Sequence, residues 1–255
     1  MTTSLQNKPI IITGAASGIG RATAKLLHKH GAKLSLWDVQ TAELTTFGLE
    51  LNAHTLVVDV TNADSVAQAM QDAFTHIGPP AAVIHSAGIL RTGLFNDIPL
   101  TQQQKIIEVN LTGSLNIAYH TLPHLRQTAG SLIFLASTSA LYGPPEYASY
   151  GASKAGVLSL AQALRVENEK AGVHIAAVIP SFVDTPMNTA HNPDIKLYER
   201  FGVAHSAEDV AQAILTQGLQ KRRFHIWPNI QPRLLYILAL FTNPFGHLLM
   251  RLFWR

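Results

Sequence analysis

A glycine-rich turn after the first apolar segment constrains the fold of this chain more than any other feature. The segment PIIIT, residues 9–13, leads directly into GAASGIG, residues 14–20, and the helical pattern RATAKLLHKH follows at once. Glycines permit a tight turn and let the backbone approach a phosphate without hindrance from a Cβ atom. The free N–H groups at the start of a helix, together with the helix dipole, favour a pyrophosphate. This context predicts a dinucleotide-binding loop, although a plain strand–helix turn has the same pattern.

Apolar segments rich in β-branched residues alternate with segments of helical length. Nearly all-apolar strands, each followed by a helix, indicate a parallel sheet that is covered on both faces. Thr101-x-x-Gln104 and Ser206-x-x-Asp209 have the pattern of capping boxes at helix starts. We therefore predict an α/β fold, a doubly wound parallel sheet of the Rossmann type with about seven strands over residues 1–228. The candidate strands are residues 9–13, 33–37, 55–58, 82–85, 131–136, 173–179 and 224–227.

Composition narrows the class of protein. Of the 255 residues, 47% are apolar and 14% are charged, so a sizeable core is expected and disorder is not. The lack of cysteine excludes disulfides, thiolate metal sites and cysteine nucleophiles. The twelve histidines are scattered without metal-ligand spacing, and His120 and His124 lack the glutamate of a zinc-protease helix, so we expect no metal site. No signal peptide is visible at the amino terminus, and we therefore expect a cytoplasmic protein.

The stretch YGASK, residues 150–154, places a phenol and an ammonium four residues apart among small side chains. On a helix, Tyr150 and Lys154 would lie on the same face, one above the other. A weak acid beside a fixed positive charge should have a lowered pKa. Taken alone, an exposed lysine on an amphipathic helix explains the stretch equally well.

Together, YGASK and the Gly-x3-Gly-x-Gly spacing resemble the short-chain dehydrogenase/reductase family, over residues 8 to about 227. The resemblance implies a catalytic set of Asn110, Ser137, Tyr150 and Lys154. Tyr150 would be the acid/base, and Lys154 would lower its pKa and bind the nicotinamide ribose. Ser137 would donate a hydrogen bond to the substrate oxygen, and Asn110 would hold a water that links Lys154 to solvent.

Asp38 ends the second candidate strand and bears on the choice of cofactor. A carboxylate there can accept hydrogen bonds from the adenosine ribose and would repel a 2′-phosphate, which favours NAD(H) over NADP(H). The alternative role of Asp38 is the start of a turn. The family resemblance matches Asp59 to an aspartate that contacts the adenine edge, and the alternative role of Asp59 is the cap of the following helix. The family's Asn-Ala-Gly is Ser-Ala-Gly here, with Ser86, and its Pro-Gly is Pro-Ser, with Ser181. The resemblance assigns cofactor contacts to Gly14, Ser17, Gly18, Ile19, Gly20, Asp38, Asp59, Val60, Ala87, Gly88, Tyr150, Lys154, Pro180, Val183 and Thr185.

The resemblance implies an NAD(H)-dependent oxidoreductase that transfers a hydride between nicotinamide and a secondary alcohol or ketone. The alternatives are a 3-oxoacyl thioester reductase and, in another class, a catalytically silent NAD-binding sensor or scaffold. The expected pocket segments (90–94, 140–142 and 188–204) are largely apolar, with Arg91 the one obvious cation, which favours a steroid-, retinoid- or acyl-chain-like substrate. The candidate substrate contacts are Ser137, Leu141, Tyr147, Phe182 and Met187.

An apolar, basic extension, residues 229–255, follows the last candidate strand. Residues 210–255 contain six Lys or Arg and no Asp or Glu, whereas the rest of the chain has a net charge of −3 (13 basic against 16 acidic residues). Two apolar helices are predicted, 233–242 and 244–254, and each is too short to cross a bilayer. The extension suits assembly into a homodimer or homotetramer, capping of the substrate pocket, or peripheral contact with an anionic membrane.

Overall fold

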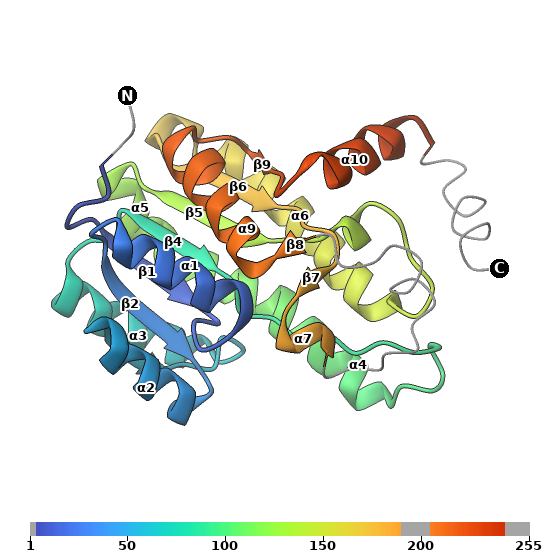
Figure 1. Ribbon diagram of the computed structural model, residues 1–255, viewed down its shortest axis with the longest axis horizontal. Coiled ribbons are helices and arrows are strands. Elements are labelled where there is room, and N and C mark those ends of the chain that lie inside the picture. The colour runs from blue at the N-terminus through green and yellow to red at the C-terminus, as the bar shows by residue number, and fades with distance from the viewer. Residues whose placement is uncertain (1–3, 190–204, 243–255) are drawn as a thin grey trace.

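Seven parallel strands form the central sheet of this protein, as seen in a computed structural model that describes residues 4–189 and 205–242 (Figure 1). They follow the order β3-β2-β1-β4-β5-β6-β9. The order reverses between β1 and β4, and ligands of open α/β sheets bind at such a point, outside the carboxyl ends of the strands. The strand bounds are β1 (Pro9–Thr13), β2 (Lys33–Asp38), β3 (His54–Val57), β4 (Ala82–His85), β5 (Ser131–Leu135), β6 (His174–Val178) and β9 (His225–Ile226).

Helices cover both faces of this sheet. The first layer contains α1, α2 and α9, and the second contains α3, α5 and α6. Ile10 and Ile12 belong to the core under the first layer and Ile11 to the core under the second, because successive side chains of a strand alternate between faces. The helix bounds are α1 (Gly18–Lys29), α2 (Thr41–Leu51), α3 (Ala63–Ile77), α4 (Leu100–Ile107), α5 (Gly113–Thr128), α6 (Ala148–Glu167), α7 (Pro186–Thr189), α9 (Ala207–Ala213) and α10 (Ile230–Thr242).

The doubly wound α/β fold predicted from the sequence is confirmed, and all seven candidate strands pair in the central sheet within one residue of their predicted ends. Several short elements were not predicted. Two-residue strands β7 (Val183–Asp184) and β8 (His205–Ser206) pair with each other at the edge of the binding region. Turns of π-helix occupy Glu108–Thr112 and Ile214–Gln220, and 3₁₀ turns occupy Thr138–Ala140 and Glu169–Ala171.

One of the two predicted capping boxes is present. The Ser206 hydroxyl accepts from the backbone N–H of Asp209, and the Asp209 carboxylate accepts from the backbone N–H of Ser206, at 3.1 and 2.9 Å. The prediction for Thr101 is wrong, since α4 begins at Leu100 with Pro99 as its N-cap and no side-chain cap bond. Proline fixes its own backbone angle, and with Pro99 as the N-cap the helix starts two residues earlier than predicted, which leaves Thr101 inside the first turn.

The predicted extension begins with α10, which leaves the sheet after β9 and extends along the outside of the molecule (Figure 1). The predicted helix 244–254 lies outside the described residues. Among residues 4–189 and 205–242, no helix is long and apolar enough to cross a membrane.

Candidate functional site

A cleft of about 620 Å³ opens at the carboxyl ends of the central strands and extends from the glycine loop to α10. Three predicted site residues, Gly20, Asn110 and Leu141, lie outside its lining. The side chains of residues 188–204 are not among those described. The predicted site residues that line the cleft are Gly14, Ser17, Gly18, Ile19, Asp38, Asp59, Val60, Ala87, Gly88, Ser137, Tyr147, Tyr150, Lys154, Pro180, Phe182, Val183, Thr185 and Met187.

The glycine loop is shaped by positions where a Cβ atom would not fit. Gly14 has a φ of +64°, and a Cβ there would lie 2.7 Å from the backbone nitrogen of Ala87. A Cβ on Gly20 would overlap the carbonyl oxygen of Gly14, so this glycine lets α1 start against the loop without itself lining the cleft. The result is a shallow backbone cradle at the amino end of α1, where N–H groups have no partner within the helix.

Asp38 joins the end of β2 to this loop. Its carboxylate is buried and accepts from the backbone N–H groups of Ala16, at 2.9 Å, and Gln40, at 3.0 Å. The bond to Gln40 is the turn contact that the sequence left open as an alternative. Each carboxylate oxygen has a second lone pair, so Asp38 can still accept from a ligand hydroxyl in the cleft.

Asp59 also lines the cleft, and it does not cap the following helix. Its Oδ1 accepts from the backbone N–H and the hydroxyl of Thr61, at 2.9 and 2.8 Å, while Asn62 supplies the cap of α3. Burial, the largest single effect, would by itself raise the pKa of Asp59, but the two hydrogen bonds from Thr61 and the charge of Lys105 together outweigh it and the pKa is lowered.

Helix α6 brings Tyr150 and Lys154 to one side of the cleft, one turn apart. The Tyr150 side chain is hydrogen-bonded to that of Ser137, which follows the end of β5. The Lys154 Nζ is buried, lies 5.6 Å from the centre of the Tyr150 ring and donates to the carbonyl oxygen of Leu135 at 2.8 Å. The three groups therefore meet where β5 and α6 approach each other.

The pKa of Tyr150 differs from the sequence expectation. Burial raises it to about 12, and the hydrogen bond with Ser137 offsets only part of this effect. The sequence predicted a lowered value through Lys154. Burial instead lowers the pKa of Lys154 itself, to about 8, and its ammonium is directed at a backbone carbonyl. In the chain by itself, Tyr150 is thus a protonated phenol at neutral pH.

Asn110 is a buried support behind the cleft. It lies in the π-helical turn between α4 and α5, with its Oδ1 accepting from the backbone N–H of Ile89 at 2.8 Å. Its Nδ2 donates to the Ile89 carbonyl and to the Ser153 hydroxyl, each at 3.0 Å. Asn110 therefore ties the loop after β4 to α6, and both amide hydrogens are already used, which leaves only acceptor capacity for the predicted water.

The predicted substrate end contains a small apolar cluster separate from the two main cores. It is formed by Leu90 and Tyr147, with Tyr150, Phe182 and Met187 packed against them. The Tyr147 ring lies edge-on to the rings of Tyr150 and Phe182, with centroids 6.3 and 6.4 Å apart. Leu141, predicted as a substrate contact, packs instead against the core beneath α6.

Four features of the cleft could not be assigned from the sequence. Lys105 lines the cleft, whereas Arg91 is absent from the lining. Leu235 and Leu238 of α10 also line it, so α10 covers part of the cleft. Finally, the Tyr142 hydroxyl bonds to that of Thr242 at 2.7 Å and anchors the end of α10. The apolar, periodic pattern of residues 233–242 indicated a helix and left capping of the pocket as one of three alternatives, and the position of Leu235 and Leu238 agrees with that alternative.

Thr13 and His85 support the loop after β4, where Ser86 replaces the expected asparagine. The backbone N–H of Ala87 donates to the Thr13 hydroxyl at 3.1 Å, and that oxygen lies 2.7 Å from Nδ1 of His85. Burial lowers the pKa of His85 to about 3, and nearby Lys154 adds to the effect, so the imidazole is neutral. A neutral ring can accept the hydroxyl proton, which orients Thr13 toward Ala87.

Comparison with protein families gives the same assignment as the geometry. The family model for short chain dehydrogenases matches residues 8–196, which include the glycine loop, Ser137, Tyr150 and Lys154. The chain belongs to the short chain dehydrogenase family. The match ends before β9 and α10, so the covering of the cleft by α10 is not part of what the family model describes.

Curated relatives and a solved structure extend this assignment. An uncharacterized oxidoreductase of Staphylococcus aureus (strain USA300) is 34% identical over 229 residues, covering 88% of this chain and 96% of the relative. One from Staphylococcus epidermidis (strain ATCC 12228) is 36% identical over 189 residues, 72% of this chain and 81% of the relative. The crystal structure of a short chain dehydrogenase/reductase from Burkholderia phymatum in complex with NAD has a TM-score of 0.86 and 24% identity, covering 95% and 96% of the two chains. This last likeness supports the fold.

Proposed function

We propose that this short chain dehydrogenase is an NAD(H)-dependent oxidoreductase that transfers a hydride between nicotinamide and a secondary alcohol or ketone in a lipophilic substrate. The observation that carries the proposal is the meeting of Ser137, Tyr150 and Lys154 in the same cleft as the glycine cradle and Asp38. A silent NAD-binding sensor has no need for a proton-transfer group beside the cofactor site.

The cradle fits a dinucleotide. The space that a Cβ on Gly14 would need is taken by the loop after β4, so the backbone itself forms the floor of the site. The amino end of α1 offers N–H donors to a pyrophosphate, and Asp38 offers acceptors to ribose hydroxyls. The charge of Asp38 disfavours a 2′-phosphate, which supports NAD(H) as the preferred cofactor.

The protein's own groups move the proton. When bound, the nicotinamide supplies or accepts the hydride at its C4 atom. The protonated Tyr150 is suited to donate a proton to a carbonyl oxygen during reduction, and as phenolate it would take the proton from an alcohol. Ser137, already hydrogen-bonded to Tyr150, is placed to bind the same substrate oxygen. The Lys154 ammonium contributes positive charge beside the phenol.

A lipophilic substrate is supported by the side chains around this centre. The cluster of Leu90, Tyr147, Phe182 and Met187 borders the cleft near Tyr150, and α10 adds two leucines. Such a lining gains free energy by removing apolar surface from water and offers few partners to a polar ligand. A steroid-, retinoid- or acyl-chain-like alcohol fits these walls better than a sugar.

Turnover of a panel of secondary alcohols with NAD⁺ and with NADP⁺, followed by the absorbance of the reduced cofactor, tests the proposal. We expect turnover with NAD⁺ that increases with the apolar size of the alcohol. Reduction of 3-oxoacyl thioesters in preference to all simple ketones would favour the thioester reductase. Tight NADH binding with no turnover of any alcohol or ketone would favour the sensor and refute the proposal.

We further propose that α10 closes the substrate end of the cleft in an assembled, homodimeric or homotetrameric enzyme. Leu235 and Leu238 line the cleft, while Leu234, Ile237 and Phe241 are exposed and apolar. Truncation after Asn229 removes this helix. We expect loss of assembly in size-exclusion chromatography. Flotation of the full chain, but not of the truncated chain, with anionic vesicles would instead favour a peripheral membrane contact.

A further inference from the structure

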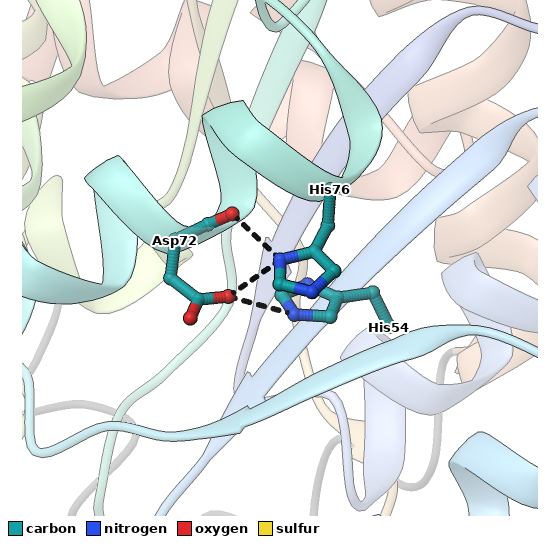
Figure 2. A group of neighbouring side chains, drawn as sticks. All are labelled: His54, Asp72 and His76. Atoms are coloured by element: carbon teal, nitrogen blue, oxygen red, sulfur yellow. Dashed lines mark hydrogen bonds and ion pairs between the residues drawn. The ribbon is translucent and has the colours of Figure 1, made fainter.

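Outside the cleft, two histidines and an aspartate from different elements come together. His54 begins β3, whereas Asp72 and His76 lie one turn apart on α3 (Figure 2). The Asp72 Oδ1 lies 2.9 Å from Nε2 of His54 and 2.9 Å from Nδ1 of His76. One ligand atom from each residue lies within 4.8 Å of the other two. The sequence alone does not reveal this group, because His54 meets Asp72 and His76 only where β3 packs beside α3.

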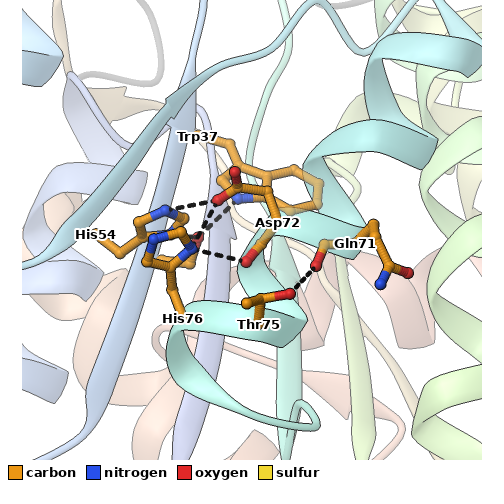
Figure 3. A network of polar contacts seen from close by, with 7 residues as sticks. Trp37, His54, Gln71, Asp72, Thr75 and His76 are labelled. Atoms are coloured by element: carbon orange, nitrogen blue, oxygen red, sulfur yellow. Dashed lines mark hydrogen bonds and ion pairs between the residues drawn. The ribbon is translucent and has the colours of Figure 1, made fainter.

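A buried pair of side chains fixes the orientation of His54. The Nδ1 of His54 lies 3.0 Å from the Ser35 hydroxyl, and this oxygen accepts from the indole N–H of Trp37 at 2.9 Å (Figure 3). Ser35 and Trp37 are fully buried on β2, and Trp37 comes directly before Asp38 in the chain. A histidine that binds metal through one nitrogen usually has the other nitrogen held by a hydrogen bond in this way.

The hydroxyl of Ser35 suits both forms of the ring. With a proton on Nε2, His54 donates to Asp72 and its Nδ1 accepts from Ser35. With Nε2 bound to a cation, the proton moves to Nδ1 and is donated to the Ser35 oxygen. Between His54 and Ser35 only the hydroxyl hydrogen has to rotate, so this support holds in both states.

The side chains of Asp72 and His76 are more exposed than that of His54, although the Oδ1 atom of Asp72 is itself buried. The side chains of Asp72 and His76 are 43% and 55% exposed, against 16% for His54. The rings of His54 and His76 are stacked, with centroids 4.2 Å apart and planes at 14°. Since a metal lies in the plane of each imidazole that binds it, the His76 ring must turn out of the stack to share an ion with His54. Its exposure on the helix surface permits this rotation.

We propose that His54, Asp72 and His76 form a binding site for one divalent transition-metal ion, with Zn²⁺ as the best match. Two imidazoles and one carboxylate suit Zn²⁺ and its neighbours, and they are poor ligands for Mg²⁺ or Ca²⁺, which prefer oxygen. Water completes the coordination. The ion ties β3, the edge strand of the sheet, to α3, and it lies outside the proposed catalytic cleft. An ordinary surface ion pair is the competing explanation.

Titration of the full chain with ZnCl₂ in an isothermal calorimeter tests the site. We expect the wild type to bind one more Zn²⁺ than His76→Ala and one more than Asp72→Asn. His28→Ala is the matched control, because His28 is an exposed helical histidine on α1, outside the cluster. It should bind as the wild type does. Titration with MgCl₂ should give no comparable heat.

Thermal unfolding provides a second measurement that does not depend on enzyme activity. We expect Zn²⁺ to raise the Tm of the wild type and of His28→Ala, and to leave the Tm of His76→Ala unchanged. The side chains of His76 and His28 are both exposed, so the Tm of each of these two variants should equal that of the wild type when no metal is added. Equal Zn²⁺ binding and equal Tm shifts in the wild type and His76→Ala would overturn the proposal, as would a wild type that binds no Zn²⁺.

Discussion

Replacing Tyr150 by phenylalanine removes one oxygen atom from the centre of the proposed chemistry. The ring and its edge contact with Tyr147 are kept. The variant loses the hydrogen bond to Ser137 but no longer buries a hydroxyl, so the stability should change by about 1 kcal/mol or less. NADH binding should be nearly unchanged because Lys154, Asp38 and the glycine loop remain.

The rate should fall by a factor of about 10² to 10⁴, the usual contribution of a general acid or base. The pH dependence of the wild type follows from the pKa of about 12. At pH 8 only about one phenol in 10⁴ is ionised, so oxidation, which needs the phenolate, should accelerate up to tenfold per pH unit. Reduction needs the phenol and should stay level over the same range. A positive charge from the bound cofactor would shift this rise to lower pH without changing its direction.

Steady-state rates with NAD⁺ and a secondary alcohol between about pH 6 and 10, together with NADH binding measured by fluorescence, check this prediction. Tyr142→Phe is the matched control, because Tyr142 also lines the cleft but its hydroxyl bonds to Thr242 at the end of α10. It should retain most activity. Activity above a few per cent in Tyr150→Phe, with the pH profile of the wild type, would refute the role of Tyr150.

Three further changes probe other parts of the molecule. Asp38→Ala should weaken NAD(H) binding and reduce the ratio of kcat/KM with NAD(H) to kcat/KM with NADP(H). Asp38→Asn can still accept from the Ala16 N–H, so it should reduce this ratio with a smaller loss of NAD(H) affinity. A wild type that prefers NADP(H) contradicts the charge argument. Ser206→Ala removes the capping box with Asp209 and should lower the free energy of unfolding by about 1 kcal/mol, which a lower Tm would show. An unchanged Tm would mean that the cap does not stabilise the fold. Leu238→Asp should raise KM for long apolar alcohols with no effect on NADH affinity, and equal KM values would show that α10 does not contact substrate.

The strands and the cofactor loop were predictable because their signals are local. An apolar strand core, a glycine turn and a helix start each depend on neighbouring residues, as does the pair of Tyr150 and Lys154 on one helix face. Pro99 shows the limit of such local signals, since this proline, two residues before the expected cap, is the N-cap of α4 and the helix starts two residues earlier than predicted. The strands β7 and β8 have two residues each, which is too short for any alternating pattern.

Features that depend on packing could not be predicted. The sequence places Lys154 one turn from Tyr150, but it does not reveal that Nζ donates to the Leu135 carbonyl or that burial dominates both pKa values. The cluster around Asp72 and the place of α10 over the cleft likewise arise from contacts between distant segments. Local patterns thus predict which groups are present, and the packing decides their charge and direction.

Lys154 shows how function and stability oppose each other in this site. Burial lowers its pKa from 10.5 to about 8. At pH 7 the charged form of Lys154 therefore destabilises the folded chain by about 3 kcal/mol relative to the unfolded chain. Between pH 8 and 10.5 the unfolded state binds the extra proton, and stability should therefore rise with pH across this window. Lys154→Met removes that cost but leaves the Leu135 carbonyl without its donor, which costs about 1–3 kcal/mol. We expect an inactive variant with weak NADH binding, a stability at pH 7 equal to or above that of the wild type, and no rise between pH 8 and 10.5. Urea unfolding of both proteins across this pH range measures the difference, and the same rise in both would show that Lys154 carries no burial cost.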